Sequence, residues 1–122
     1  MGTETGSAPV LDERQVTSTI GDDPGAIREF IDVAMQDIVP RVADLQAAAA
    51  RDDQAGVQKT AHALKGVALS IGAMRLGSAF REIEQAARAA DSGRIKDGVS
   101  GVGAELKALL DALAVRGWGA PP

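Results

Sequence analysis

The chain has 122 residues, of which 45% are hydrophobic and 25% are charged, and this length suits one compact domain. It contains no cysteine and one histidine, which excludes disulfides, thiolate nucleophiles and zinc sites built on cysteines or on several histidines. The formal charge is −4 and the aromatic residues are two Phe and one Trp. Nucleic acid is therefore not an expected partner, because its binding needs positive charge and stacked rings.

The two ends of the chain predict tails. Residues 1–10 are polar and lack the apolar stretch of a secretory signal, so we expect disorder there. Residues 117–122 contain two glycines and two prolines, which cannot continue a helix. Trp118 is expected to cap the core, and an exposed position is the alternative. No uncharged apolar run approaches the ~18 residues of a membrane span, so the folded domain, residues 11–116, is expected to be cytoplasmic and without a membrane partner.

Helical periodicity fills the folded part, and no stretch alternates as a strand does. Asp12 and Gln15 have the spacing of a capping box and predict a short helix ending near Gly21. Asp23 followed by proline predicts the start of a long helix over roughly residues 24–50. Pro40 lies inside this second helix, where we expect a bend rather than a break.

Three further helices are expected: one from Asp52 or Asp53 to Gly72, one over residues 74–90 and one over roughly residues 94–115. Their connections are short and their lengths similar, which favours antiparallel neighbours. The predicted fold is an all-α, antiparallel up-down four-helix bundle with a short additional N-terminal helix. Its expected core stripes are Ile27, Ile31, Ala34, Ile38, Val42, Leu45 and Ala49; Val57, Ala61, Leu64, Ala68 and Ile71; Leu76, Ala79, Phe80, Ile83, Ala87 and Ala90; and Ile95, Val99, Val102, Leu106, Leu109 and Leu113.

The segment around the single histidine carries the chemistry. At about 100° per residue, His62 falls away from the core stripe of its helix and points to solvent. Lys59 and Lys65 flank it one turn to either side, and Gly66 leaves bare backbone beside it. A single histidine on the surface of a helix most often has no specific function. A glycine within a helix costs ~1 kcal/mol relative to alanine and usually marks close approach by another group, which favours a functional site.

This segment resembles the histidine-containing phosphotransfer (HPt) domains of multistep His-Asp phosphorelays. The family pattern A-H-x-L-K-G-x-A, then Gly-Ala, then a helix ending in Leu-Glu is similar to Ala61–Ala68, Gly72-Ala73 and Leu76–Glu84 here. The resemblance extends over nearly the whole chain. It implies that His62 is phosphorylated, that Lys65 screens the phosphoryl group and that Gly66 gives it clearance. Val67, Leu69 and Phe80 depart from the residues that the family commonly has.

Phosphoryl transfer itself requires a neutral imidazole. A histidine has an ordinary pKa near 6.5, so much of it is neutral at pH 7, and nearby lysines favour the neutral form. For Nε2 to attack, Nδ1 must hold the proton, and Gln58, one turn earlier, is expected to accept that hydrogen bond. Exposed lysines at 59 and 65 would help to hold the phosphoryl group.

Other chemistry is not expected of this chain. It has no P-loop, kinase nucleotide pattern or acidic cluster for Mg²⁺, so no cofactor or metal is expected to bind, and the receiver partner is expected to bring Mg²⁺. The glycines Gly98, Gly101 and Gly103 follow no predicted strand, and their spacing differs from that of a dinucleotide-binding motif, which disfavours such a site. Four carboxylates at helix-surface spacing indicate salt-bridged faces rather than a di-metal site: Glu82, Glu84, Glu105 and Asp111.

The partners implied are receiver domains of response regulators or hybrid histidine kinases. The first 53 residues carry four basic and eleven acidic side chains, whereas the rest carry nine basic and six acidic, so charges at the rim would steer docking. Leu69, Ile20, Ile27 and Met74 are candidates for an apolar docking patch, and bundle core is the alternative for the last three. The expected protein is a monomeric phosphocarrier without kinase or phosphatase activity of its own; the alternative is a docking or scaffold bundle that has lost transfer.

Overall fold

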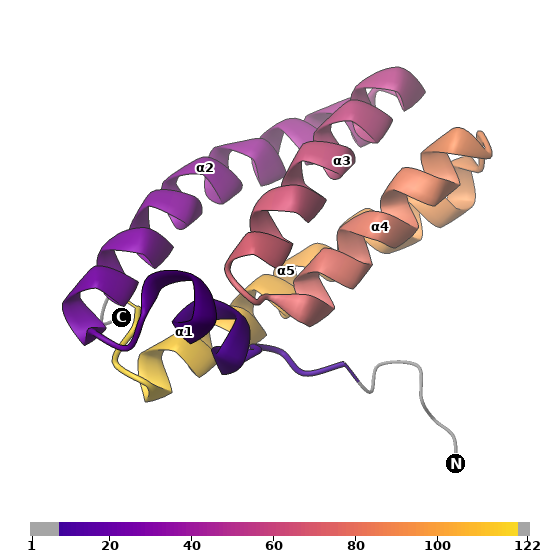
Figure 1. Cartoon of the computed structure of the whole chain (residues 1–122). Helices are drawn as coiled ribbons and strands as arrows, with labels where there is room; N and C mark the ends of the chain where they lie inside the picture. Colours follow the sequence, from indigo (N-terminus) through magenta and orange to yellow (C-terminus); the bar gives the residue numbers. More distant parts are fainter. Residues whose placement is uncertain (1–7, 120–122) are drawn as a thin grey trace, which may run out of the picture.

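Five helices account for most of residues 8–119, the part of the chain that the computed structural model describes (Figure 1). They are α1 (Glu13–Ile20), α2 (Pro24–Ala50), α3 (Gln54–Ser70), α4 (Met74–Arg88) and α5 (Ser92–Val115). Helices α2 to α5 form the up-down bundle, and α1 lies across one end of it beside the start of α2 (Figure 1). The predicted all-α four-helix bundle with a short N-terminal helix is confirmed. Of the two predicted tails, residues 1–10 and 117–122, the parts at residues 1–7 and 120–122 lie outside the described residues.

Aspartates begin four of the five helices. Asp12, Asp23, Asp53 and Asp91 each accept hydrogen bonds from backbone N–H groups in the first turn of the helix that follows, which satisfies donors that a helix leaves unpaired at its start. The predicted starts of α1, α2 and α3 are confirmed. Helix α2 continues through Pro40 without a break.

The junction of α4 and α5 differs from the prediction. Helix α4 stops at Arg88 instead of Ala90, because Ala90 turns into the left-handed region at φ 54°. The amide of Asp91 then donates to the carbonyl of Ala86 and closes the helix end. Since the Asp91 side chain also caps α5, that helix begins at Ser92, two residues before the predicted start.

The predicted core stripes of α2 and α3 are buried in full, as are most of those of α4 and α5. Two positions of α4 differ: Ala79 is half-buried, and Ala90 is exposed because the helix has ended before it. In α5, Val99 and Leu106 are half-buried and pack against the core. The core of this bundle is therefore aliphatic, with Phe80 as its largest fully buried side chain.

Two glycines allow α4 to lie close to both of its neighbours. A Cβ atom on Gly77 would lie 2.5 Å from Cδ2 of Leu69 in α3, and one on Gly98 of α5 would lie 2.7 Å from Cγ1 of Ile83 in α4. Both distances are shorter than real carbon contacts, so a side chain at either position would push helices apart. The close pairing of α3 with α4 positions the groups of the candidate site.

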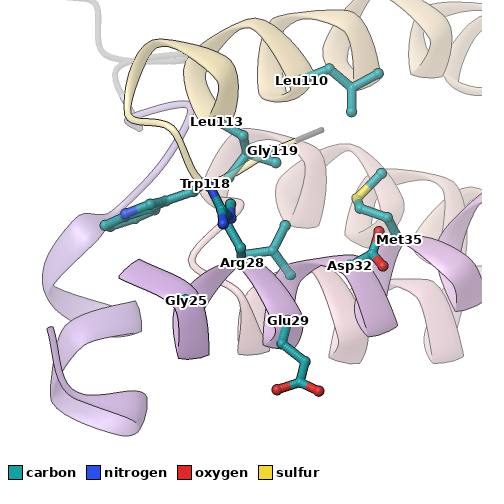
Figure 2. A pocket seen from close by; sticks show the side chains of 10 residues that line it. Gly25, Arg28, Glu29, Asp32, Met35, Leu110, Leu113, Trp118 and Gly119 are labelled. Atoms are coloured by element: carbon teal, nitrogen blue, oxygen red, sulfur yellow. The ribbon is translucent and has the colours of Figure 1, made fainter. Parts of the chain in front are cut away.

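Trp118 closes the bundle at the far end of α5. It is 9% exposed, so the prediction that it caps the core is confirmed. Its amide donates to the carbonyl of Leu113, which holds this residue against the end of α5. Beside it, a cavity of about 580 Å³ lies between α2 and α5 and is lined in part by Met35 and Leu110 (Figure 2). No helix within residues 8–119 is long and apolar enough to cross a membrane.

Replacement of Trp118 by alanine is expected to lower the free energy of unfolding by about 3 kcal/mol, because a large buried ring is removed and no neighbour fills its place. Urea unfolding followed by far-UV circular dichroism measures this change. As a control, Leu110→Ala removes a side chain of the same region that is 46% exposed and should cost about 1 kcal/mol or less. Equal effects of the two substitutions would contradict the assignment of Trp118 to the core.

Candidate functional site

His62 stands on the outer face of α3. Its neighbours Ala61 and Leu64 are completely buried, whereas the side chain of His62 is 66% exposed. The helical period explains the contrast, since the core stripe and the histidine lie on different sides of the same helix. The predicted exposure of the ring is confirmed.

The ring is held by a carboxylate of α4. Nδ1 of His62 lies 2.9 Å from Oε2 of Glu84. Nζ of Lys65 donates to Oε1 of the same carboxylate at 2.9 Å, and a guanidinium nitrogen of Arg88 donates to Oε2, also at 2.9 Å. We refer to Glu84 and these three partners as the Glu84 cluster. Glu84 is 3% exposed, and a buried carboxylate requires such partners to remain charged.

The cluster keeps Glu84 charged and sets the tautomer of His62. The hydrogen bond from Lys65 holds the pKa of the Glu84 carboxyl below its ordinary value; burial acts in the opposite direction, and the hydrogen bond from His62 adds to the lowering. Glu84 is therefore ionised at neutral pH. An ionised carboxylate only accepts hydrogen bonds, so Nδ1 of His62 carries a proton and donates it to Oε2. In the neutral form of the ring, the free lone pair is therefore on Nε2.

The partner predicted for Nδ1 was wrong. Gln58 was expected to accept this hydrogen bond, but Glu84 does so from the neighbouring helix. Gln58 is half-buried on α3, and Lys59 is exposed on the same helix. Gln58 lies on the same helix as His62, one turn earlier. Glu84 comes from the neighbouring helix and reaches Nδ1 because α3 and α4 pack closely.

Gly66 faces open space. A Cβ atom on this residue would meet no other part of the described chain within 4 Å, unlike one on Gly77 or Gly98. Nothing in the packing of residues 8–119 therefore explains a glycine here, although it costs helix stability. The bare backbone lies one turn after His62 and next to Lys65, where an approaching molecule would use the clearance.

The candidate docking residues divide into two groups. Ile27 is 1% exposed, so its place in an exposed patch is wrong and the alternative, a position in the core stripe of α2, is confirmed. Ile20, Leu69 and Met74 are half-buried. Leu69 packs over Gly77 of α4, so its departure from the family pattern contributes to helix packing.

Glu84 is the site residue that the sequence reasoning placed on a surface. Three of the four carboxylates assigned to salt-bridged faces do form ion pairs there: Glu82 with Arg94, Glu105 with Arg75 and Asp111 with Lys107. Glu84 is ion-paired but buried. The signal was present in the sequence, because Glu84 follows Phe80 by four residues and precedes Ala87 by three, which places a carboxylate on the apolar face of α4.

Comparisons with known proteins agree with this geometry. The sequence matches the family model described as Hpt domain over residues 29–115. The chain belongs to the Hpt domain family. Its structure is similar to the crystal structure of histidine-containing phosphotransfer protein B (HptB) from Pseudomonas aeruginosa PAO1, with a TM-score of 0.81 and 25% sequence identity over 91% of this chain and 96% of that chain. No curated protein matches the sequence. This Hpt domain is a phosphocarrier that acts in histidine phosphotransfer within phosphorelays.

The lowered pKa of Glu84 predicts acid-sensitive stability. The folded chain binds this proton more weakly than the unfolded chain, so the contribution of Glu84 to stability is present above its ordinary pKa of 4.5 and is lost as the pH falls through the lower folded-state pKa. At pH 7, Glu84→Gln should lower the free energy of unfolding by about 1–3 kcal/mol. Urea unfolding between pH 7 and pH 3 should show that difference shrinking in acid.

Glu82→Gln is the matched control. Glu82 is on the same helix, but its side chain is 70% exposed and its closest cation, Arg94, lies at 3.7 Å, so this change should have little effect at any pH. A difference between Glu84→Gln and the unchanged protein that stays constant down to pH 3 would show that the Glu84 charge does not stabilise the fold.

Proposed function

We propose that His62 is the residue of this Hpt domain that accepts and donates the phosphoryl group. The protein has one histidine, and its ring is exposed. The observation that carries the proposal is the 2.9 Å contact between Nδ1 and the buried Glu84 carboxylate, because it leaves the Nε2 lone pair available for attack. HptB of Pseudomonas aeruginosa, a histidine-containing phosphotransfer protein, has the same fold.

The transfer step follows from that tautomer. The Nε2 lone pair attacks the phosphorus of an aspartyl phosphate on a receiver domain, in line with the acyl oxygen. The N–P bond forms as the P–O bond breaks, and the receiver aspartate leaves as a carboxylate with the electron pair. The proton on Nδ1 does not move, because Glu84 already accepts from it. Attack by the aspartate of a second receiver reverses these bond changes and returns His62 to its starting state.

Lys65 and Gly66 serve the transferred group in this proposal. The Lys65 ammonium has three N–H donors, of which one is used on Glu84, so it can also donate to a phosphoryl oxygen. Gly66 gives clearance to the phosphoryl group and to the receiver that carries it, and Lys59 adds positive charge at the rim. Glu84 with Lys65 and Arg88 leaves one net positive charge beside His62, which favours a doubly negative phosphoryl group.

The proposed partners are receiver domains of response regulators or hybrid histidine kinases, which supply Mg²⁺ and the in-line geometry. Ile20, Leu69 and Met74 would provide the apolar part of the docking surface. We further propose that the protein acts as a cytoplasmic monomer and has no kinase or phosphatase activity of its own. The scaffold alternative is not favoured, because the family match and an accessible histidine occur together.

Incubation with a phosphorylated receiver domain should place an acid-labile, base-stable phosphate on this protein and none on the His62→Gln variant. Phosphate-affinity gel electrophoresis after acid or alkaline treatment measures it. The control is a pull-down, in which His62→Gln should still retain the same receiver because docking does not require the ring. An unchanged yield of phosphate on the variant would exclude His62, and no transfer to the unaltered chain from any receiver of its source organism would favour the scaffold.

Gly66→Ala should separate stability from transfer. Alanine in an exposed helix is expected to raise the free energy of unfolding by about 0.5–1 kcal/mol, because its Cβ meets nothing in this chain. The same Cβ would face the receiver and slow transfer, by about tenfold if the reactants are displaced slightly from in-line geometry. Gly101→Ala in α5, where a Cβ also meets nothing, should stabilise the protein equally and leave the rate of transfer unchanged. Equal transfer rates in the two variants would contradict the proposed clearance.

A further inference from the structure

We propose that Glu84 is a positioning residue for the phosphorylated state, in which its negative charge keeps a proton on Nδ1 of phosphohistidine 62 and so keeps that residue a good phosphoryl donor. The inference rests on the proposed function and goes one step further. It concerns the release of the phosphoryl group rather than its acceptance, and it gives a role to a residue outside the helix that carries the histidine.

The placement of Glu84 makes it suited to this role. Among residues 8–119 it is the one charged side chain that is buried. Oε1 accepts from Lys65, and Oε2 accepts from both Arg88 and His62. Three bonds from two helices fix the carboxylate, so it cannot turn away when the charge on the ring changes. Phosphorylation occurs on Nε2 and leaves the contact at Nδ1 in place.

The charge of the ring decides how readily the N–P bond breaks. When Nδ1 is protonated, the phosphorylated ring is a cation. Breaking the N–P bond then returns the electron pair to Nε2 and releases a neutral imidazole, while the proton stays on Nδ1. If Nδ1 has lost its proton, the same bond change would release an imidazolate anion, which is a much poorer leaving group. An anion hydrogen-bonded to Nδ1 favours the protonated, donor-competent form.

The surrounding charges set how strongly Glu84 holds the proton on Nδ1 of His62. On α3, Lys65 shares the carboxylate, and Lys59 lies one turn before the histidine. On α4, Arg88 shares Oε2, and its side chain is 61% exposed. No other charged side chain of the described chain forms an ion pair with any member of the Glu84 cluster. The two cations on Glu84 oppose a cationic ring, so removal of Arg88 should strengthen the hold on the Nδ1 proton.

The single histidine permits a direct test. The full chain, labelled with ¹⁵N at histidine, is phosphorylated with phosphoramidate, and the ¹⁵N shift of Nδ1 is followed from pH 5 to pH 10. Glu84→Gln keeps a neutral acceptor of the same size, and its titration midpoint should fall by about one to two pH units relative to the unaltered chain. Arg88→Gln should move the midpoint upwards. Arg81→Gln, an exposed position on the same helix, should leave it unchanged.

Opposite shifts in the Glu84 and Arg88 variants distinguish this role from a loss of structure, which would not move the midpoint in two directions. The rate of transfer to a receiver at pH 8 should fall with Glu84→Gln, in proportion to the loss of protonated ring. An unchanged midpoint in Glu84→Gln would overturn the inference. Because phosphoramidate loads the ring without a receiver, the titration decides this point even if no receiver phosphorylates His62, a result that would instead count against the proposed function.

Discussion

The orientation of the exposed His62 ring depends on the carboxylate of Glu84, which is buried between α3 and α4 and accepts hydrogen bonds on both oxygens. An unpaired carboxylate in this position would carry a large desolvation cost. Each of its three partners is itself partly exposed, with the histidine and arginine well over half exposed and the lysine less so. The cluster therefore links a buried anion to a solvent-facing ring, and the orientation of that ring is set by the neighbouring helix.

This arrangement is compatible with two tasks for Lys65, of which the second is proposed. In the unphosphorylated protein its ammonium lies on Glu84, and it lowers the pKa of that carboxyl more than any other group does. The family resemblance implies that it screens the phosphoryl group as well. A lysine suits both tasks because its three donors lie on a flexible stem. The fork-shaped guanidinium of Arg88 adds a second cation to the carboxylate from the other side of the cluster.

Glycines control which surfaces can meet. Gly77 and Gly98 occupy positions where a Cβ would collide with a neighbouring helix, and so they permit the close packing of α4 with α3 and α5. Gly66 has no such neighbour. Glycines thus bring α4 close to α3 and α5, whereas the clearance proposed for Gly66 concerns a molecule from outside the chain.

The sequence by itself determined the helices, most of the core and the exposed position of the single histidine. Apolar residues recur at the helical period, aspartates precede each of the four helix starts that a side chain caps, and the chain has one histidine, so each of these features depends on residues close together along the chain. Asp91 also directly precedes the helix that it caps, although the predicted start of α5 was two residues too late.

Only the tertiary structure decided which of the remaining polar and apolar residues meet. Glu84 lies 22 positions after His62, and its contact with Nδ1 depends on the distance between α3 and α4, which is set by the packing of Leu69 over Gly77. Ile27 belongs to the core rather than to a docking patch because α2 is covered on that side. Periodicity assigns a residue to a face of its own helix, but which faces are brought together depends on the packing of the whole bundle.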